Sequence, residues 1–389
     1  MSELCAVVGI GQTQYATKRD DVSIPGLVRE AAMRALDDAE MTWADVDAVV
    51  IGKAPDMFEG VMMPELYLAD ALGAVGKPMM RVHTAGSVGG STALVAASLF
   101  QAGLHERVLT VGFEKQSESN ATWAVTPKAP FSPPVVAGAG GYFAPHIRAY
   151  IKRSGAPDDI GVRVALKDRL NAVRNPYAHL RNAEITFEEI KASPMLWEPL
   201  RFHEVCPSSD GACAMVLTNE AGGDGAPHPP AWVWATAMRS EPTMFAGRDQ
   251  VNPQAGQDCA RDVWEQAGIT NPREEIDVAE IYVPFSWYEP MWMENLGFCK
   301  EGEGWKMTLE GATAFDGDLP VNPSGGVMSS NPIGASGMIR FAEAALQVQG
   351  RAGEHQVEGA KKALGHAYGG GSQFFSMWIV GSEKPERQP

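Results

Sequence analysis

Short apolar runs alternate with helical patterns along the first third of the chain. Two segments have the spacing of apolar or small residues that favours a helix, Ile24–Ala39 and Ser91–Gln101. Four runs are typical of buried strands: Leu4–Gly9, Val46–Ile51, Met79–Thr84 and Val108–Phe113. This alternation predicts an α/β fold in which helices cover a parallel or mixed sheet.

The alternation stops from Glu114 to about Glu204. Prolines and glycines are dense over Pro127–Gly141, and basic helical stretches follow. A long excursion of this kind predicts an insertion that carries function or partner contacts. The basic side chains over Arg148–Arg181 are interpreted as a solvated helix surface, with binding of CoA phosphates as the alternative. Regular order resumes at Cys206–Leu217.

A pattern in the first part of the chain returns in the last part. Leu27–Ile51 has the pattern of a helix, a turn and an apolar strand, and Cys259–Ile281 repeats it about 230 residues later. The glycine-containing segments Val88–Ser91 and Ile333–Ser336 each open a helix, about 245 residues apart. Chance similarity between such junctions is the alternative, but the two similar spacings favour an internal duplication.

The duplication and the insertion together predict three regions. A chain of 389 residues is long enough for two or three domain-sized units. We expect a first half made of residues 1–113 and 205–225, an insertion over residues 114–204, and a second half over residues 226–389.

Composition narrows the class of protein. Hydrophobic residues are 45% and charged residues 21%, which predicts a globular chain. The net charge of −16 makes nucleic acid and anionic membranes poor partners. The sequence shows neither a membrane-length apolar run nor a basic leader. The five cysteines include no CxxC pair and predict reduced thiols in a cytoplasm, and no spacing of histidine and cysteine predicts a metal site.

Several motifs resemble those of the thiolase superfamily, and most closely its sterol-carrier-protein type, also called lipid-transfer proteins. The motifs are His83–Leu94, Cys206–Leu217, Asp277–Ser286, Val321–Ala335 and Leu364–Gly371. The resemblance covers nearly the whole chain. It implies the thiolase fold, in which two duplicated β-α halves form five layers (αβαβα) with an inserted loop region. It also implies a homodimer joined through the sheet edge of the first half.

The chain departs from that pattern where working thiolases carry their chemistry. Ser87 stands at the position of the cysteine nucleophile, and Asn331 and Tyr282 stand where thiolases have histidines. A neutral serine without an adjacent base is a far poorer nucleophile than a thiolate, so we do not expect Claisen chemistry. Cys206 and Cys213 fall in a strand-like segment and are interpreted as small core residues.

Two tyrosines point to a different reaction. Tyr282 and Tyr368 resemble the pair to which proton transfer is assigned in thiolase-fold steroid side-chain aldolases. The resemblance implies that both are catalytic here, with support from His366. Thiolases and retro-aldolases both stabilise an enolate next to a thioester carbonyl, and retro-aldol cleavage needs no acyl-enzyme. Which tyrosine is the base and which the acid stays open.

Other residues near these motifs are candidates for substrate binding: Ser87, Asn331, His83, Gly370 and Gly371. For Ser87 the favoured interpretation is the N-cap of the following helix. Asn331 also suits the turn before a proline, and a tyrosine at a strand end is commonly a core residue. The aromatic and methionine stripe over Phe285–Phe298 is interpreted as core or subunit packing, with the wall of an acyl pocket as the alternative.

The expected function is therefore that of a carbon–carbon lyase. It would cleave a β-hydroxyacyl-CoA, expected to be a steroid side-chain thioester, to a ketone and a short acyl-CoA, and CoA would enter with the substrate with no further cofactor. The resemblance also implies a small DUF35 partner, an OB-fold linked to a zinc ribbon, in an α2β2 assembly. The alternatives are a non-catalytic acyl-CoA or sterol-binding scaffold and a residual acyl-CoA acyltransferase that uses Ser87.

Overall fold

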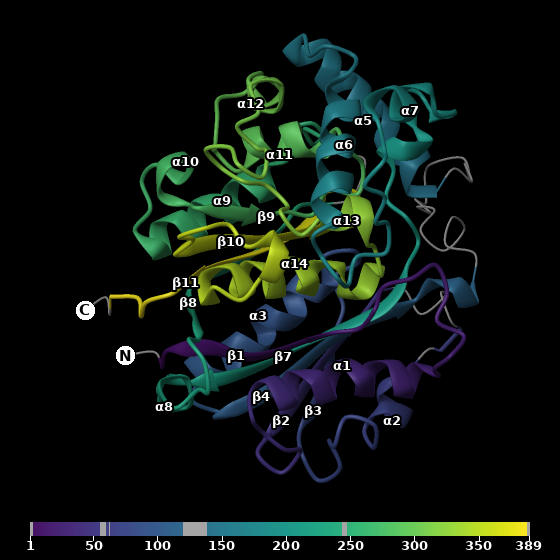
Figure 1. Cartoon of the computed structure of the whole chain (residues 1–389). Helices are drawn as coiled ribbons and strands as arrows, with labels where there is room; N and C mark the ends of the chain where they lie inside the picture. The colour runs from purple at the N-terminus through teal and green to yellow at the C-terminus, as the bar shows by residue number, and fades with distance from the viewer. Residues whose placement is uncertain (1–2, 55–59, 62, 120–137, 243–246, 387–389) are drawn as a thin grey trace.

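The computed structural model describes residues 3–54, 60–61, 63–119, 138–242 and 247–386. Within them the chain folds into five layers (Figure 1). Helix α1 covers the outer face of one half of the sheet, and helix α9 covers the outer face of the other half. Helices α3 and α14 form the middle layer, where they contact strands of both halves. These layers confirm the fold that the sequence predicts.

The first half has the elements β1 (Cys5–Gln12), α1 (Ile24–Asp38), β2 (Ala48–Lys53), α2 (Glu65–Leu68), β3 (Met79–Val82), α3 (Val88–Gln101), β4 (Arg107–Lys115), β7 (Asp210–Asn219) and α8 (Glu220–Asp224). The second half has β8 (Ala231–Ser240), α9 (Gln254–Ala267), α10 (Pro272–Glu275), β9 (Val278–Glu280), α11 (Tyr288–Asn295), α12 (Gly304–Leu309), α13 (Gly326–Ser329), α14 (Ile333–Gln349), β10 (Lys362–Gly369) and β11 (Phe374–Gly381). All four strands and both helices predicted for the first third are present, with ends shifted by a few residues.

The same strand order occurs in both halves. The described sheet runs β3-β2-β4-β7-β1-β8-β11-β10-β9, and β1 pairs with β8 where the halves meet. In the second half Val321 forms a parallel bridge to Ala279, so it lies beside β9 as β3 lies beside β2. The direction of pairing also corresponds between the halves: β2 runs parallel to β4 in the first half, as β9 runs parallel to β10 in the second. This repeated topology is what an internal duplication predicts.

The insertion forms a helical layer above the second half of the sheet. It contains α5 (Gly138–Ser154), α6 (Ile160–Ala172), α7 (Phe187–Ala192) and the hairpin of β5 (Met195–Trp197) with β6 (Leu200–Arg201). Helix α6 packs on α12 and α13 of the second half. Residues 120–137 of the insertion lie outside the described residues, and the region boundaries at 113 and 204 stay a prediction. No helix of the described ranges is long and apolar enough to cross a bilayer.

The two central helices approach each other closely at glycines. A Cβ atom on Gly89 of α3 would lie 2.5 Å from the backbone nitrogen of Met338 in α14. A Cβ atom on Gly337 would lie 2.7 Å from the backbone nitrogen of Gly90 and 2.8 Å from the Cβ of Ala367 in β10. These distances are too short for real side chains, so the crossing requires glycine on both helices. It also fixes the position of the loops that enter α3 and α14.

We expect Gly337→Ala to lower the free energy of unfolding by about 1–3 kcal/mol, because the added methyl group overpacks the helix crossing. The matched control is Gly26→Ala in α1, where a Cβ atom would lie 3.5 Å from the Ser23 hydroxyl oxygen. That change should be neutral or stabilising, since alanine is the better helix former. Urea unfolding curves of the two variants check the prediction, and equal stability of both would contradict it.

Candidate active site

Tyr282 and Tyr368 lie side by side at the ends of two parallel strands. Tyr282 follows β9 and Tyr368 belongs to β10, and these strands pair in parallel register. Their ring centroids are 5.4 Å apart, with the ring planes at 87°. Both side chains are buried, with 3% and 2% of their surface exposed. The two phenols that the sequence singled out therefore share one site.

Several polar side chains lie near the hydroxyl of Tyr282. This hydroxyl donates a long hydrogen bond to Oδ1 of Asn331 at 3.4 Å, and the Ser336 hydroxyl donates to the same oxygen at 2.8 Å. The amide nitrogen Nδ2 of Asn331 donates to Sγ of Cys206 at 3.1 Å. Asn331 thus joins the entry of α14 to Tyr282 on one side and to Cys206 on the other.

Cys206 corrects an expectation from the sequence. The residue precedes β7, which begins at Asp210, so Cys206 does not lie in a strand, whereas Cys213 does and is fully buried. Burial raises the pKa of the Cys206 thiol to about 12. The thiol stays protonated at neutral pH and does not replace a thiolase nucleophile. Pro207 directly after Cys206 was the sequence signal that the strand begins later.

Ser87 does not act as the helix cap that the sequence favoured. Its backbone is already helical (φ −79°, ψ 0°), and its side chain makes no capping hydrogen bond. The hydroxyl instead donates to the carbonyl oxygen of Thr84 at 2.7 Å and lies 2.9 Å from the Thr84 hydroxyl. Neither contact is a base, so nothing in this arrangement activates Ser87 as a nucleophile.

The end of β10 lies against the loop that carries Ser87. A Cβ atom on Gly369 would lie 2.4 Å from the backbone nitrogens of both Gly86 and Ser87. Only glycine permits this approach, which places Tyr368 next to the entry of α3. Four segments that are distant in the sequence therefore meet here: the entries of α3 and α14, the end of β9 and the end of β10.

Comparisons with known proteins agree with this arrangement. Residues 237–382 match the family described as "Thiolase C-terminal domain-like". The chain is 30% identical over 382 residues to an acetyl-CoA acetyltransferase of Methanothermobacter thermautotrophicus, with 94% of this chain and 96% of that protein covered. It is 29% identical over 404 residues to human sterol carrier protein 2, with 96% and 72% covered. A solved structure, the Ltp2-ChsH2(DUF35) aldolase, matches 100% of this chain and 99% of that chain with a TM-score of 0.83 and 26% identity.

The chain belongs to the thiolase superfamily, in its sterol-carrier-protein type. The proteins to which it is similar include an acetyl-CoA acetyltransferase and an aldolase, so its fold is one that occurs in enzymes that act on acyl-CoA. That Ser87, Asn331 and Tyr282 stand at the positions of the thiolase catalytic groups stays a prediction from the sequence motifs.

His366 contacts the backbone just after β9, and its ring stays neutral. The backbone N–H of Tyr282 donates to Nδ1 of His366 at 3.3 Å, so the ring proton is on Nε2. Burial lowers the pKa of His366 to about 3. At neutral pH the ring is therefore uncharged and carries one N–H donor. The structure therefore favours a role in holding Tyr282, although the catalytic support expected of His366 stays a prediction.

The loop after β10 has a structural reason for its glycines. Gly370, Gly371 and Ser372 all have left-handed backbone angles (φ 62°, 66° and 59°). A Cβ atom on Gly371 would lie 2.7 Å from the hydroxyl of Tyr142 in α5. Arg248 donates to the carbonyl oxygens of Gly371 at 2.8 Å and Ser372 at 3.1 Å. Contact of these glycines with substrate stays a prediction.

His83, unlike the other candidate site residues with side chains, is exposed. It directly follows β3, as the sequence predicts. Within the described residues, no group of three or more histidine, cysteine, aspartate and glutamate side chains could hold a metal ion.

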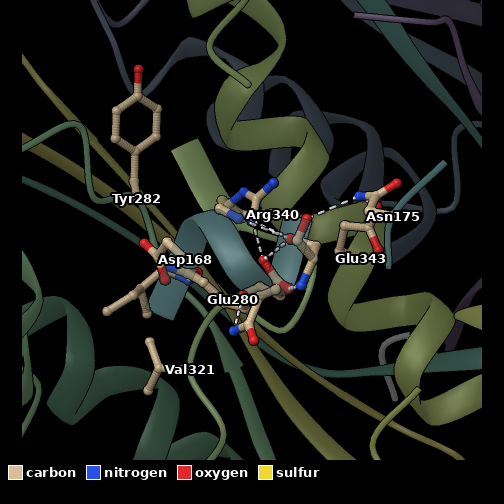
Figure 2. Close-up of polar contacts among 12 residues, drawn as sticks. Asp168, Asn175, Glu280, Tyr282, Val321, Arg340 and Glu343 are labelled. Atoms are coloured by element: carbon tan, nitrogen blue, oxygen red, sulfur yellow. Dashed lines mark hydrogen bonds and ion pairs between the residues drawn. The ribbon is translucent and has the colours of Figure 1, made fainter. Parts of the chain in front are cut away.

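An ionic cluster supports the site from below. Arg340 of α14 pairs with Glu280 at the end of β9, and Glu343 lies 2.7 Å from Nε2 of His355. Figure 2 shows that Tyr282 extends away from this cluster, with its hydroxyl on the far side. A buried ion pair that keeps all its partners holds strand and helix in a fixed relation. The cluster therefore fixes the base of Tyr282 without contacting its hydroxyl.

Aromatic side chains enclose Tyr368. Phe143 of α5, Trp292 of α11 and Phe375 of β11 have ring centroids 6.2, 4.9 and 6.1 Å from that of Tyr368. The stripe over Phe285–Phe298 thus supplies both core packing and part of the wall around Tyr368. Burial raises the pKa of Tyr282 and of Tyr368 well above the ordinary value near 10, so both are neutral phenols.

The lowered pKa of His366 predicts a pH-dependent stability. The folded pKa of about 3 lies below the unfolded value, so the contribution of the neutral ring is complete above about pH 6.5 and is lost as the pH falls toward 3. We expect a loss of about 2 kcal/mol at pH 5 from this group. Urea unfolding at pH 7.5 and pH 5 should show a smaller pH-dependent loss in His366→Leu than in the wild type. An unchanged loss in the variant would contradict the assignment.

Proposed function

We propose that this thiolase-superfamily protein is a carbon–carbon lyase that cleaves a β-hydroxyacyl-CoA by a retro-aldol reaction. The observation that carries the proposal is the contact between two buried, neutral phenols, Tyr282 and Tyr368, at the entry of the two central helices. In the described part of the chain the Ser87 hydroxyl bonds the carbonyl and hydroxyl oxygens of Thr84, neither of which is a base, and this argues against an acyltransferase. The similarity to an aldolase over the whole chain supports the same reaction.

The reaction needs only the movement of one proton. The proton leaves the β-hydroxyl oxygen as the bond between the α and β carbons breaks, and the β carbon becomes a ketone. The bonding electron pair passes to the α carbon as the enolate of a short acyl-CoA, and that carbon then takes up a proton. Because the cleavage involves no net oxidation or reduction, it needs no co-reactant, and the two phenols suffice to carry the proton.

We infer that the proton passes through neutral phenols. Burial favours the uncharged form of both tyrosines, so the phenol that receives the hydroxyl proton passes its own proton on in the same step, through the second phenol to the α carbon. The Tyr282 hydroxyl already donates to Asn331, which leaves its lone pairs available to a substrate hydroxyl. Which tyrosine faces the hydroxyl and which faces the carbon stays open.

The acyl group and the partners are parts of the same proposal. The aromatic wall around Tyr368 suits a bulky apolar acyl group such as a steroid side chain. The similarity to the Ltp2-ChsH2(DUF35) aldolase supports a DUF35 partner. Strand β3 is at the edge of the described sheet, where a second copy of the chain would form the expected homodimer. We propose that the protein lies in the cytoplasm. We propose that the reaction uses no cofactor beyond the CoA of the substrate.

We expect Tyr282→Phe and Tyr368→Phe each to lower kcat at least about 100-fold, because each removes a proton donor and acceptor. The substrate should be a series of β-hydroxyacyl-CoA thioesters that ends in a steroid side-chain thioester, with the released short acyl-CoA measured by mass spectrometry. Tyr150→Phe is the matched control, since its hydroxyl bonds Glu294 and not the site. Full turnover in both site variants would refute the proposal.

The neutral relay also predicts the pH dependence of kcat. Both phenols keep their protons and His366 remains uncharged between pH 6 and pH 9, so we expect kcat to be nearly constant over this range. A resting phenolate as the base would instead raise kcat about tenfold per pH unit below its pKa. Turnover measured at saturating substrate across this range distinguishes the two cases.

A binding scaffold without activity is the second candidate. The similarity to human sterol carrier protein 2, which covers 96% of this chain, favours a binding scaffold. In that case the wild type would retain the thioester unchanged, with no short acyl-CoA released in the assay.

A further inference from the structure

A third buried tyrosine lies against the proposed catalytic pair. Tyr288 is the first residue of α11, and its ring stacks on that of Tyr368 with centroids 5.6 Å apart and planes at 16°. His366 stacks on Tyr368 at 6.3 Å and 17°. Tyr368 is therefore in contact with two further polar rings.

The polar atoms of this stack lack hydrogen-bond partners in the described part of the chain. They are the hydroxyls of Tyr288 and Tyr368 and Nε2 of His366, together with the nearby hydroxyl of Ser372. All four residues are at most 2% exposed. Each of these atoms carries a proton, since the other ring nitrogen of His366 accepts from the Tyr282 backbone. Each of the four can therefore donate a hydrogen bond, although the three hydroxyl oxygens can also accept one, and the group contains no carboxylate.

Other buried phenols of this chain are fully satisfied. The Tyr15 hydroxyl donates to Oε1 of Gln12 at 2.8 Å, and the Tyr150 hydroxyl donates to Oε1 of Glu294 at 2.8 Å. Leaving a buried hydroxyl without a partner is unfavourable, so native proteins seldom keep several together unless a ligand or water completes them. Apart from the Ser372 hydroxyl, the described neighbours of Tyr288 are aromatic rings, which accept hydrogen bonds only weakly, so an oxygen atom of a ligand would be the stronger acceptor for its hydroxyl.

We propose that Tyr288 is a third substrate-contacting phenol, whose hydroxyl donates to an oxygen atom of the bound acyl-CoA beside Tyr368. The acyl-CoA ligand rests on the proposed function, but the donor role of Tyr288 does not depend on cleavage. A thioester carbonyl, its enolate oxygen and a β-hydroxyl all offer the lone pairs that a set of donors requires. The resemblance to known aldolases implied no role for this residue.

The test compares Tyr288→Phe with Tyr15→Phe, which removes a satisfied buried hydroxyl. Without ligand, Tyr288→Phe should keep or raise the wild-type Tm, because it removes an unpaired polar group, whereas Tyr15→Phe should lower the Tm. With saturating 3-hydroxy-3-methyloctanoyl-CoA as the probe, whose tertiary β-hydroxyl would give a ketone, the ligand-induced rise in Tm should fall by at least half in Tyr288→Phe and persist in Tyr15→Phe. Turnover should fall at least tenfold in Tyr288→Phe alone.

Each contrary result has a defined meaning. A Tyr288→Phe variant with the full ligand-induced rise in Tm overturns the inference and leaves an ordered water as the partner of this hydroxyl. A drop in unliganded Tm as large as that of Tyr15→Phe overturns it too, because the hydroxyl would then be structural. A wild type without any response to the probe overturns it as well. If the wild type binds the probe without cleaving it, the lyase proposal fails while the binding comparison still decides the role of Tyr288.

Discussion

The close crossing of α3 and α14 is the constraint on which the rest of the site depends. Gly89 and Gly337 allow the two helices to meet at backbone distance, and Ala367 of β10 packs against the same point. The crossing places the loop before α3 next to the loop before α14, with Ser87 in one and Asn331 in the other. Two halves with the same topology thereby contribute to one shared set of polar groups, which neither half forms by itself.

Two kinds of buried polar group coexist around this crossing. In the ionic cluster Arg340 pairs with Glu280 and His355 pairs with Glu343, which ties β9 to α14 beneath Tyr282, although Nε of Arg340 has no hydrogen-bond partner in the described part of the chain. The phenols above it are only partly paired, and an unpartnered buried hydroxyl costs about 1–3 kcal/mol of stability. A fold that tolerates such atoms needs a rigid support below them. The paired cluster provides this support and leaves the hydroxyls available to a ligand.

The altered thiolase positions form a consistent set. Ser87 turns its hydroxyl to Thr84, Asn331 contacts Tyr282 and Cys206, and Tyr282 contacts Tyr368. If these positions correspond to those of the thiolase catalytic groups, as the sequence motifs predict, each residue present here lacks the nucleophile or histidine of a thiolase. Stabilising an enolate beside a thioester depends on directed hydrogen-bond donors more than on a nucleophile. The same scaffold can therefore support a different bond cleavage.

The sequence by itself determined the elements and the internal duplication, because these follow from periodicity and repeat spacing, and its resemblance to thiolase-fold aldolases implied the pairing of Tyr282 with Tyr368. The structure decided the rest: Ser87 bonds Thr84 rather than capping its helix, Cys206 faces Asn331 across 125 residues of sequence, and Tyr288 stacks on Tyr368. The physical reason is that local pattern sets secondary structure and burial. The partner of a particular hydroxyl, thiol or ring is instead set by which distant segments the helix crossing brings together.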